Sequence, residues 1–176
     1  MPAKPAMNTR VALVAVTAIF FMWGFITELN DVLIPHLKSV FELKYWQASL
    51  IQVCFFGAYL LMAVPAGMVV ARVGYKLGIV TGLLVAGGGA LLILPAAQMG
   101  SYNLFLPALF ILASGIVLLQ VSANPYVALL GAPERAPSRL NFAQAINSIG
   151  HTIGPWVGGA LILGATHVSA EQLAAL

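Results

Sequence analysis

The sequence predicts an all-α membrane protein, and three observations lead to that fold class. Of its 176 residues, 61% are hydrophobic and only 7% are charged, whereas a soluble domain carries about 25% charged residues. The apolar residues fall into five stretches of roughly 20 residues or more, each long enough for a helix to cross a bilayer. Short segments that contain charge, glycine or proline separate them. A bundle of about five transmembrane helices is therefore expected.

The first helix is expected over residues 11–37, and a short acidic motif, ELND, lies within it. Glu28 and Asp31 are three residues apart, so they share one face of a helix. Pro35 removes the hydrogen bond that the carbonyl of Asp31 would accept, which loosens this turn. Carboxylates at membrane depth are costly and usually belong to an ion, proton or substrate pathway. Alternatively, the helix ends before both acids, but apolar residues resume directly after them.

The next three helices are expected over residues 46–71, 78–97 and 104–130. The middle one contains GLLVAGGGA, whose glycines are normal where membrane helices approach closely. In the last one, Gln120 and Asn124 lie one helical turn apart, and Pro125 directly follows. This proline frees a backbone carbonyl one turn earlier. Polar side chains beside a broken turn therefore occur twice in the sequence.

A fifth helix is expected over residues 141–163, and its first half is polar. The polar side chains on one broad face are those of Asn141, Gln144, Asn147, Ser148 and His151. Such a face is expensive against lipid, so it should meet a cavity or another helix. One polar residue alone is more often structural, but five together favour a cavity. Gly150, Gly154 and Gly158 recur beside this face and permit close helix contact.

The basic residues predict the orientation of the bundle. In a five-helix arrangement one side carries Lys4, Arg10, Arg72, Lys76, Arg135 and Arg139, and the other carries Lys38 and Lys44. The positive-inside rule then places residues 1–10 in the cytoplasm. Residues 166–176 are too short and polar to cross again and are expected as an extracytoplasmic tail. The expected location is the inner (plasma) membrane, which the chain crosses several times.

Several classes of function are disfavoured by composition. The basic residues form no dense patch, so nucleic acid is not an expected partner. Cys54 is the only cysteine and the three histidines are far apart, so no metal site and no cofactor are predicted. No serine, cysteine or histidine stands in a recognisable nucleophile and base arrangement, which disfavours an enzyme.

Five stretches together resemble one known family: FFMWGFITELNDVLIPHLK, ASLIQVCFFGAYLLMAVPAG, YKLGIVTGLLVAGGGALL, VLLQVSANPYVALLG and SRLNFAQAINSIG. The chain resembles the N-terminal part of the fucose/proton symporter family of the major facilitator superfamily, particularly its glucose/galactose transporter branch. The resemblance implies a twelve-helix fold in two halves, of which residues 11–165 form part of the N-terminal bundle. It also implies a truncated chain whose partners are the lipid bilayer and a missing C-terminal half.

The resemblance assigns expected roles to individual residues. Asp31 occupies the place of the proton-linked aspartate in the family's LND motif. Glu28 stands where relatives often have an uncharged residue, and it is a second candidate for proton coupling. Gln120 replaces a glutamate of the fucose symporters, as in the glucose/galactose branch, which argues against fucose as substrate. The polar positions that line or border the sugar cavity in the family correspond to Asn124, Asn141, Gln144 and Asn147.

The expected function is secondary active, proton-coupled uptake of a hexose, either glucose/galactose or fucose-like, by alternating access. Amide groups that donate and accept hydrogen bonds suit sugar hydroxyls. One alternative is a drug or metabolite antiporter of the same superfamily, since residues 150–159 also fit its GxxxGPxxGG pattern. Another is a truncated membrane protein without transport of its own, because alternating access requires two bundles around a central site.

Overall fold

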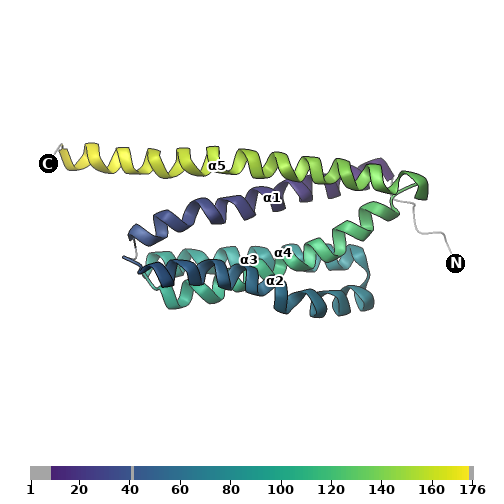
Figure 1. Ribbon diagram of the computed structural model, residues 1–176, viewed down its shortest axis with the longest axis horizontal. Helices are drawn as coiled ribbons and strands as arrows, with labels where there is room; N and C mark the ends of the chain where they lie inside the picture. Colours follow the sequence, from purple (N-terminus) through teal and green to yellow (C-terminus); the bar gives the residue numbers. More distant parts are fainter. Residues whose placement is uncertain (1–8, 41, 175–176) are drawn as a thin grey trace.

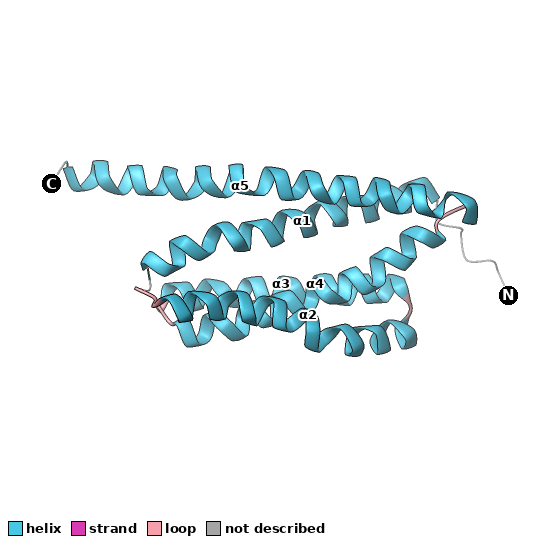
Figure 2. Ribbon diagram, in the orientation of Figure 1, coloured by secondary structure: helices cyan, strands magenta, loops and turns pink. Residues whose placement is uncertain are grey.

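The computed structural model describes residues 9–40 and 42–174, and almost all of them are helical (Figure 2). The elements in chain order are α1 (Thr9–Val40), α2 (Tyr45–Val73), α3 (Tyr75–Gln98), α4 (Tyr102–Leu129), the short 3₁₀ helix η1 (Pro133–Arg135) and α5 (Ala136–Ala174). The described residues form no strand. The all-α fold expected from the sequence is confirmed.

The helices run back and forth along one axis and fall into two groups (Figure 1). Helix α1 packs mainly against α5, whereas α2 and α3 pack mainly against α4. Fewer contacts join α1 to α2 and α4, or α4 to α5. Helices α1 to α4 are each long and apolar enough to cross a membrane. The long α5 carries the polar residues described above in its first half.

Helix α1 continues past both acidic residues to Val40, with Pro35 inside it. The alternative in which the first helix ends before Glu28 is therefore excluded. Helix α5 also extends further than the range of 141–163 expected for it, because the segment expected as a tail is helical up to Ala174. That segment contains helix-favouring alanine, glutamate, glutamine and leucine, and no glycine or proline interrupts it after residue 164.

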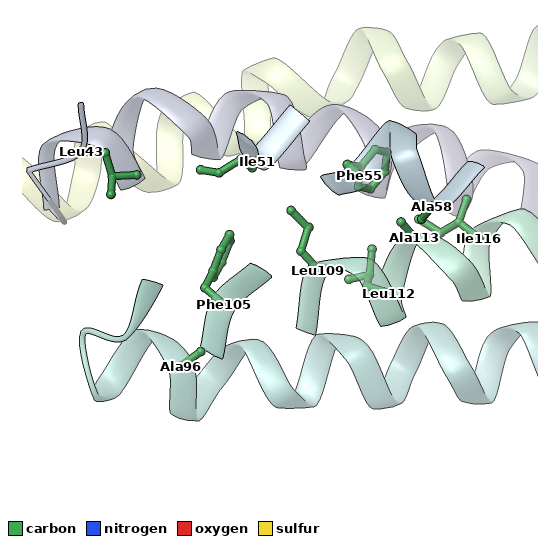
Figure 3. Close-up of a cluster of buried hydrophobic side chains, with 10 residues drawn as sticks. All are labelled: Leu43, Ile51, Phe55, Ala58, Ala96, Phe105, Leu109, Leu112, Ala113 and Ile116. Atoms are coloured by element: carbon green, nitrogen blue, oxygen red, sulfur yellow. The ribbon is translucent and has the colours of Figure 1, made fainter. Parts of the chain in front are cut away.

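The largest apolar cluster lies where α2 and α3 meet α4. Figure 3 shows Ile51 and Phe55 of α2 facing Phe105 and Leu109 of α4. Burial of such side chains contributes about 1.5–3 kcal/mol each in water, but within a bilayer close packing is what distinguishes a neighbouring helix from lipid. Helix α4 is thus the centre of this group.

A second apolar cluster joins the two groups near the N-terminal end of α1. It is formed by Val16, Phe20, Ile79, Leu119, Ala123, Val127 and Ala143. These residues come from α1, α3, α4 and α5, so this end of the bundle is tied together across all four helices.

One arginine forms hydrogen bonds across the link between α4 and α5. Arg139, in the first turns of α5, donates to the backbone carbonyls of Val127, Ala128 and Ala132. The last carbonyls of a helix have no intrahelical donor, and a cation there also complements the helix dipole. Arg139 therefore supplies hydrogen-bond donors to carbonyls at the C-terminal end of α4.

Glycines set the closest approaches between helices. A Cβ atom at Gly150 of α5 would overlap the carbonyl oxygen of Phe21 in α1, and one at Gly115 of α4 would overlap the backbone of Ala86 in α3. Backbones that approach so closely gain van der Waals contact that larger residues would prevent. The expectation that Gly150 permits close helix contact is confirmed.

Replacing Gly150 by alanine should destabilise the protein by about 1–3 kcal/mol, because the added methyl group has no room against Phe21. Gly159 on the same helix has open space around it and is the matched control. There, alanine should be neutral or stabilise by about 0.5–1 kcal/mol, because glycine is a poor helix former. Unfolding followed by circular dichroism in mixed micelles measures both. Equal effects at the two positions would contradict this packing.

Candidate proton and substrate site

The two predicted site residues of α1, Glu28 and Asp31, lie where this helix meets α5 and α2. Asp31 and Glu28 share one face of α1, as expected, but they reach different neighbours. The Nε2 amide of Gln52 in α2 donates to Oδ1 of Asp31 over 3.2 Å. The carboxylate is half-buried, and this hydrogen bond links the two groups of helices.

Glu28 pairs with the opposite neighbour of α1. Its Oε2 atom lies 3.0 Å from Nδ1 of His151 in α5, and the side chains are 29% and 37% exposed, respectively. A neutral imidazole with its proton on Nδ1, or an imidazolium, can donate to this carboxylate. Asp31 and Glu28 therefore have separate polar partners on two different helices.

Gln120 lies on α4 and its amide donates to the hydroxyl group of Tyr59 in α2 over 3.0 Å. In α1, one of the helices beside α2, the hydroxyl group of Thr27 donates to the backbone carbonyl of Trp23. This group of residues presents amide and hydroxyl groups beside aromatic rings and carries no formal charge. Such neutral donors and acceptors can bind other hydroxyl groups.

The amide row of α5 is divided between two environments. Asn147 is buried and its Nδ2 donates over 2.8 Å to the carbonyl of Phe20 in α1. Asn141 and Gln144 are exposed, and Gln144 lies roughly 10 Å along the helix from His151. One member of the row thus joins two helices, while two others face outwards.

Some buried polar atoms have no partner in the described part of the chain. They are Oδ1 of Asn124, Nδ2 of Asn30 and Oγ1 of Thr17. A buried polar atom without a hydrogen bond costs about 1–3 kcal/mol, so each is available to a ligand or to water. Asn124 lies one turn from Gln120, and its free acceptor extends the polar group around Tyr59.

A cavity of about 310 Å³ lies between α1, α3, α4 and α5. Its lining is apolar except for Asn30, and none of the predicted site residues contributes to it. Sugars need several hydrogen-bonding partners, so this cavity does not suit one. No cluster of three or more histidine, cysteine, aspartate or glutamate residues suited to a metal ion occurs among the described residues.

Two further polar residues belong to the site although the sequence did not single them out for it. Gln52 and Tyr59 are seven residues apart in α2, so they lie on one face two turns apart. Gln52 contacts Asp31 and Tyr59 contacts Gln120. Their seven-residue spacing could have indicated a shared polar face of α2. The apolar and aromatic residues between them made that pattern hard to recognise in the sequence.

The chain is similar to several known proteins. The family model described as Major Facilitator Superfamily matches residues 11–169. The glucose/galactose transporter of Brucella abortus biovar 1 (strain 9-941) is 59% identical over 158 residues, which cover 90% of this chain and 38% of that protein. The L-fucose-proton symporter of Escherichia coli (strain K12) is 42% identical over 146 residues, 83% of this chain and 33% of that protein.

The fold is similar to that of a solved structure as well. A crystal structure of the Escherichia coli fucose:proton symporter superposes with a TM-score of 0.77 at 37% sequence identity. The match covers 90% of this chain and 38% of that one. The chain therefore spans about two-fifths of the length of the relatives that it matches.

Replacing Asn147 by leucine should destabilise the contact between α1 and α5 by about 1–2 kcal/mol, because the carbonyl of Phe20 loses its donor. Gln144→Leu is the matched control, since this exposed side chain should change stability by less than about 0.5 kcal/mol. Denaturation in mixed micelles compares the two. A stability loss confined to Gln144→Leu would contradict the assigned contacts.

Proposed function

We propose that this chain, which belongs to the Major Facilitator Superfamily, forms part of the N-terminal half of a secondary active sugar transporter. The transported sugar is a hexose such as glucose or galactose, and its uptake is coupled to protons by alternating access. A second helical bundle completes the transport path. The names of the relatives support this proposal, and the described residues supply the chemistry for it.

The observation that carries the proposal is the position of Asp31. This carboxylate lies inside a helix long and apolar enough to span a membrane, and it accepts a hydrogen bond from the neutral amide of Gln52. No lysine or arginine occurs within residues 46–71 of α2 or 103–129 of α4 to pair with it. A carboxylate that exchanges a proton changes charge at membrane depth, where charge is costly. Proton binding at Asp31 can therefore bias the protein between two conformations.

The neutral groups around Tyr59 suit a sugar. Gln120, Tyr59 and the free acceptor of Asn124 provide both donors and acceptors, and aromatic faces lie beside them. Asn141 and Gln144 on the open side of α5 border the same path in this proposal. Asn147 joins α5 to α1 through its Nδ2, and its Oδ1 remains a candidate acceptor for the sugar in this proposal. A drug antiporter is less consistent with this concentration of amides.

The orientation that we propose places the N-terminus in the cytoplasm of a cell that carries the protein in its inner membrane. The helices alternate in direction (Figure 1), so the α2–α3 and α4–α5 links lie at the same end as the start of α1. These links carry Arg72, Lys76, Arg135 and Arg139, whereas the opposite end carries Lys38 and Lys44. This asymmetry supports the orientation.

Asp31→Asn should abolish hexose accumulation driven by a pH gradient and leave downhill exchange of the sugar intact, because an amide binds no proton. Proteoliposomes measure both, with the chain alone and with the chain co-expressed with the remaining C-terminal residues of the Brucella relative. Labelled glucose, galactose and fucose are compared with a lipophilic cation.

The control for that experiment is Glu134→Gln, which neutralises an exposed carboxylate in the 3₁₀ helix and should leave accumulation unchanged. Accumulation that persists in Asp31→Asn would refute the role of this residue. Transport of the lipophilic cation without any hexose would favour the antiporter instead.

Two single cysteines test the orientation. In a Cys54→Ala background, Glu134→Cys should react with a membrane-impermeant maleimide only from the cytoplasmic side, and Asn103→Cys only from the opposite side. Both positions are exposed at helix links. The reverse pattern in intact cells and inverted vesicles would overturn the proposed topology.

A further inference from the structure

Tyr59 and Gln120 form a neutral pair whose mutual contact uses only part of their hydrogen-bonding capacity. The Nε2 amide of Gln120 in α4 donates to the phenol oxygen of Tyr59 in α2 over 3.0 Å. This bond occupies one N–H of the amide and one lone pair of the phenol. It leaves the Oε1 carbonyl of Gln120 as an acceptor and the O–H of Tyr59 as a donor. The pair therefore keeps a donor and an acceptor next to each other.

The reverse orientation of the amide has the same consequence. If the O–H of Tyr59 donates to Oε1 instead, the N–H groups of Gln120 remain as donors and the phenol oxygen remains as an acceptor. A glutamate at position 120 would differ, because its carboxylate would accept from the phenol and leave acceptors only. The combined donor and acceptor character thus requires an amide beside the phenol.

The phenol is held in place by its neighbours on α2. The centroid of the Tyr59 ring lies 5.6 Å from that of Phe55 and 6.0 Å from that of Phe56. Phe55 is fully buried, and the Tyr59 ring packs against two of the apolar clusters of the bundle. A ring fixed in this way presents its hydroxyl group at one place, which lowers the entropic cost of binding a ligand there.

The two helices that carry the pair offer it no formal charge. Residues 46–71 of α2 and 103–129 of α4 contain no charged residue. Gln52, which binds the carboxylate of Asp31, lies seven residues before Tyr59, roughly 10 Å along α2. One turn after Gln120, the Oδ1 atom of Asn124 has no partner within the described residues. These groups suit a neutral ligand with several hydroxyl groups better than an ion.

We propose that Tyr59 and Gln120 together bind two hydroxyl groups on neighbouring carbons of the transported sugar, and that Tyr59 also positions the amide. The assignment rests on the function proposed above and narrows the recognised group to a vicinal diol. The two side chains are joined by a contact of 3.0 Å, so the hydroxyl groups that they bind must lie close together. One hydroxyl gives its hydrogen to the free acceptor, and its neighbour accepts from the free donor. Tyr59 is thereby a specificity-determining residue.

Competition by glucose analogues tests this assignment. Binding of labelled glucose is measured in lipid nanodiscs, with the chain alone and with the chain co-expressed with the C-terminal residues of the Brucella relative. The competitors are analogues that each lack one hydroxyl group. Tyr59→Phe and Gln120→Leu should each weaken glucose binding about 3–10-fold, as the loss of a neutral hydrogen bond does. Both variants should also lose the affinity penalty that the unmodified protein shows for the same two analogues, whose missing hydroxyls are on neighbouring carbons.

Tyr75→Phe is the control, since it removes the hydroxyl group of an exposed tyrosine at the start of α3. It should leave glucose affinity and every penalty unchanged. Gln120→Leu, on a different helix, repeats the test independently if Tyr59→Phe loses helicity by circular dichroism. Penalties that stay the same in the variants, or that change at anything other than two neighbouring hydroxyls, would overturn this assignment alone. An unmodified protein that binds no hexose would refute the proposed function together with it.

Discussion

The cost of polar groups at membrane depth is the constraint on which this structure depends. Each such group must find a partner within the protein or face a water-accessible space. Among the described residues, three of these contacts are made on α1, where Asp31 contacts Gln52, Glu28 contacts His151 and the carbonyl of Phe20 contacts Asn147. The same contacts position α2 and α5 on either side of α1. The contacts that give these polar groups their hydrogen-bond partners are thus the same contacts that fix the arrangement of the helices.

The sequence predicted the helices and the two acids inside the first one because both depend on local physical rules. Long apolar stretches define the spans, and ELND interrupts one of them without any residue that favours a loop. Asp31 and Glu28 could be placed on one face of α1 from their spacing alone. Their partners could not, because periodicity says which residues share a face but not which helix opposes it.

The polar row of α5 illustrates the same limit. A broad helix face meets a neighbour along one edge and open space along the other, so Asn147 is buried while Gln144 is exposed. Tyr59 was missed for a different reason, since a single hydroxyl group in an aromatic run has no distinctive pattern. The length of α5 also exceeded its expected range, because helix-favouring residues follow the apolar stretch directly.

The clamp that Arg139 makes on the end of α4 has a mechanical consequence. It fixes the corner between α4 and α5 at the end of the bundle where an apolar cluster also joins α1, α3, α4 and α5. Towards the opposite end, the apolar cavity beside Leu29 and Leu33 separates the same helices. A rocking motion between the two groups would therefore pivot at the Arg139 corner and have its largest amplitude at the far end. The hydrogen bond from Gln52 to Asp31 joins the two groups towards that far end, so the charge on Asp31 would directly affect how firmly they are held together there.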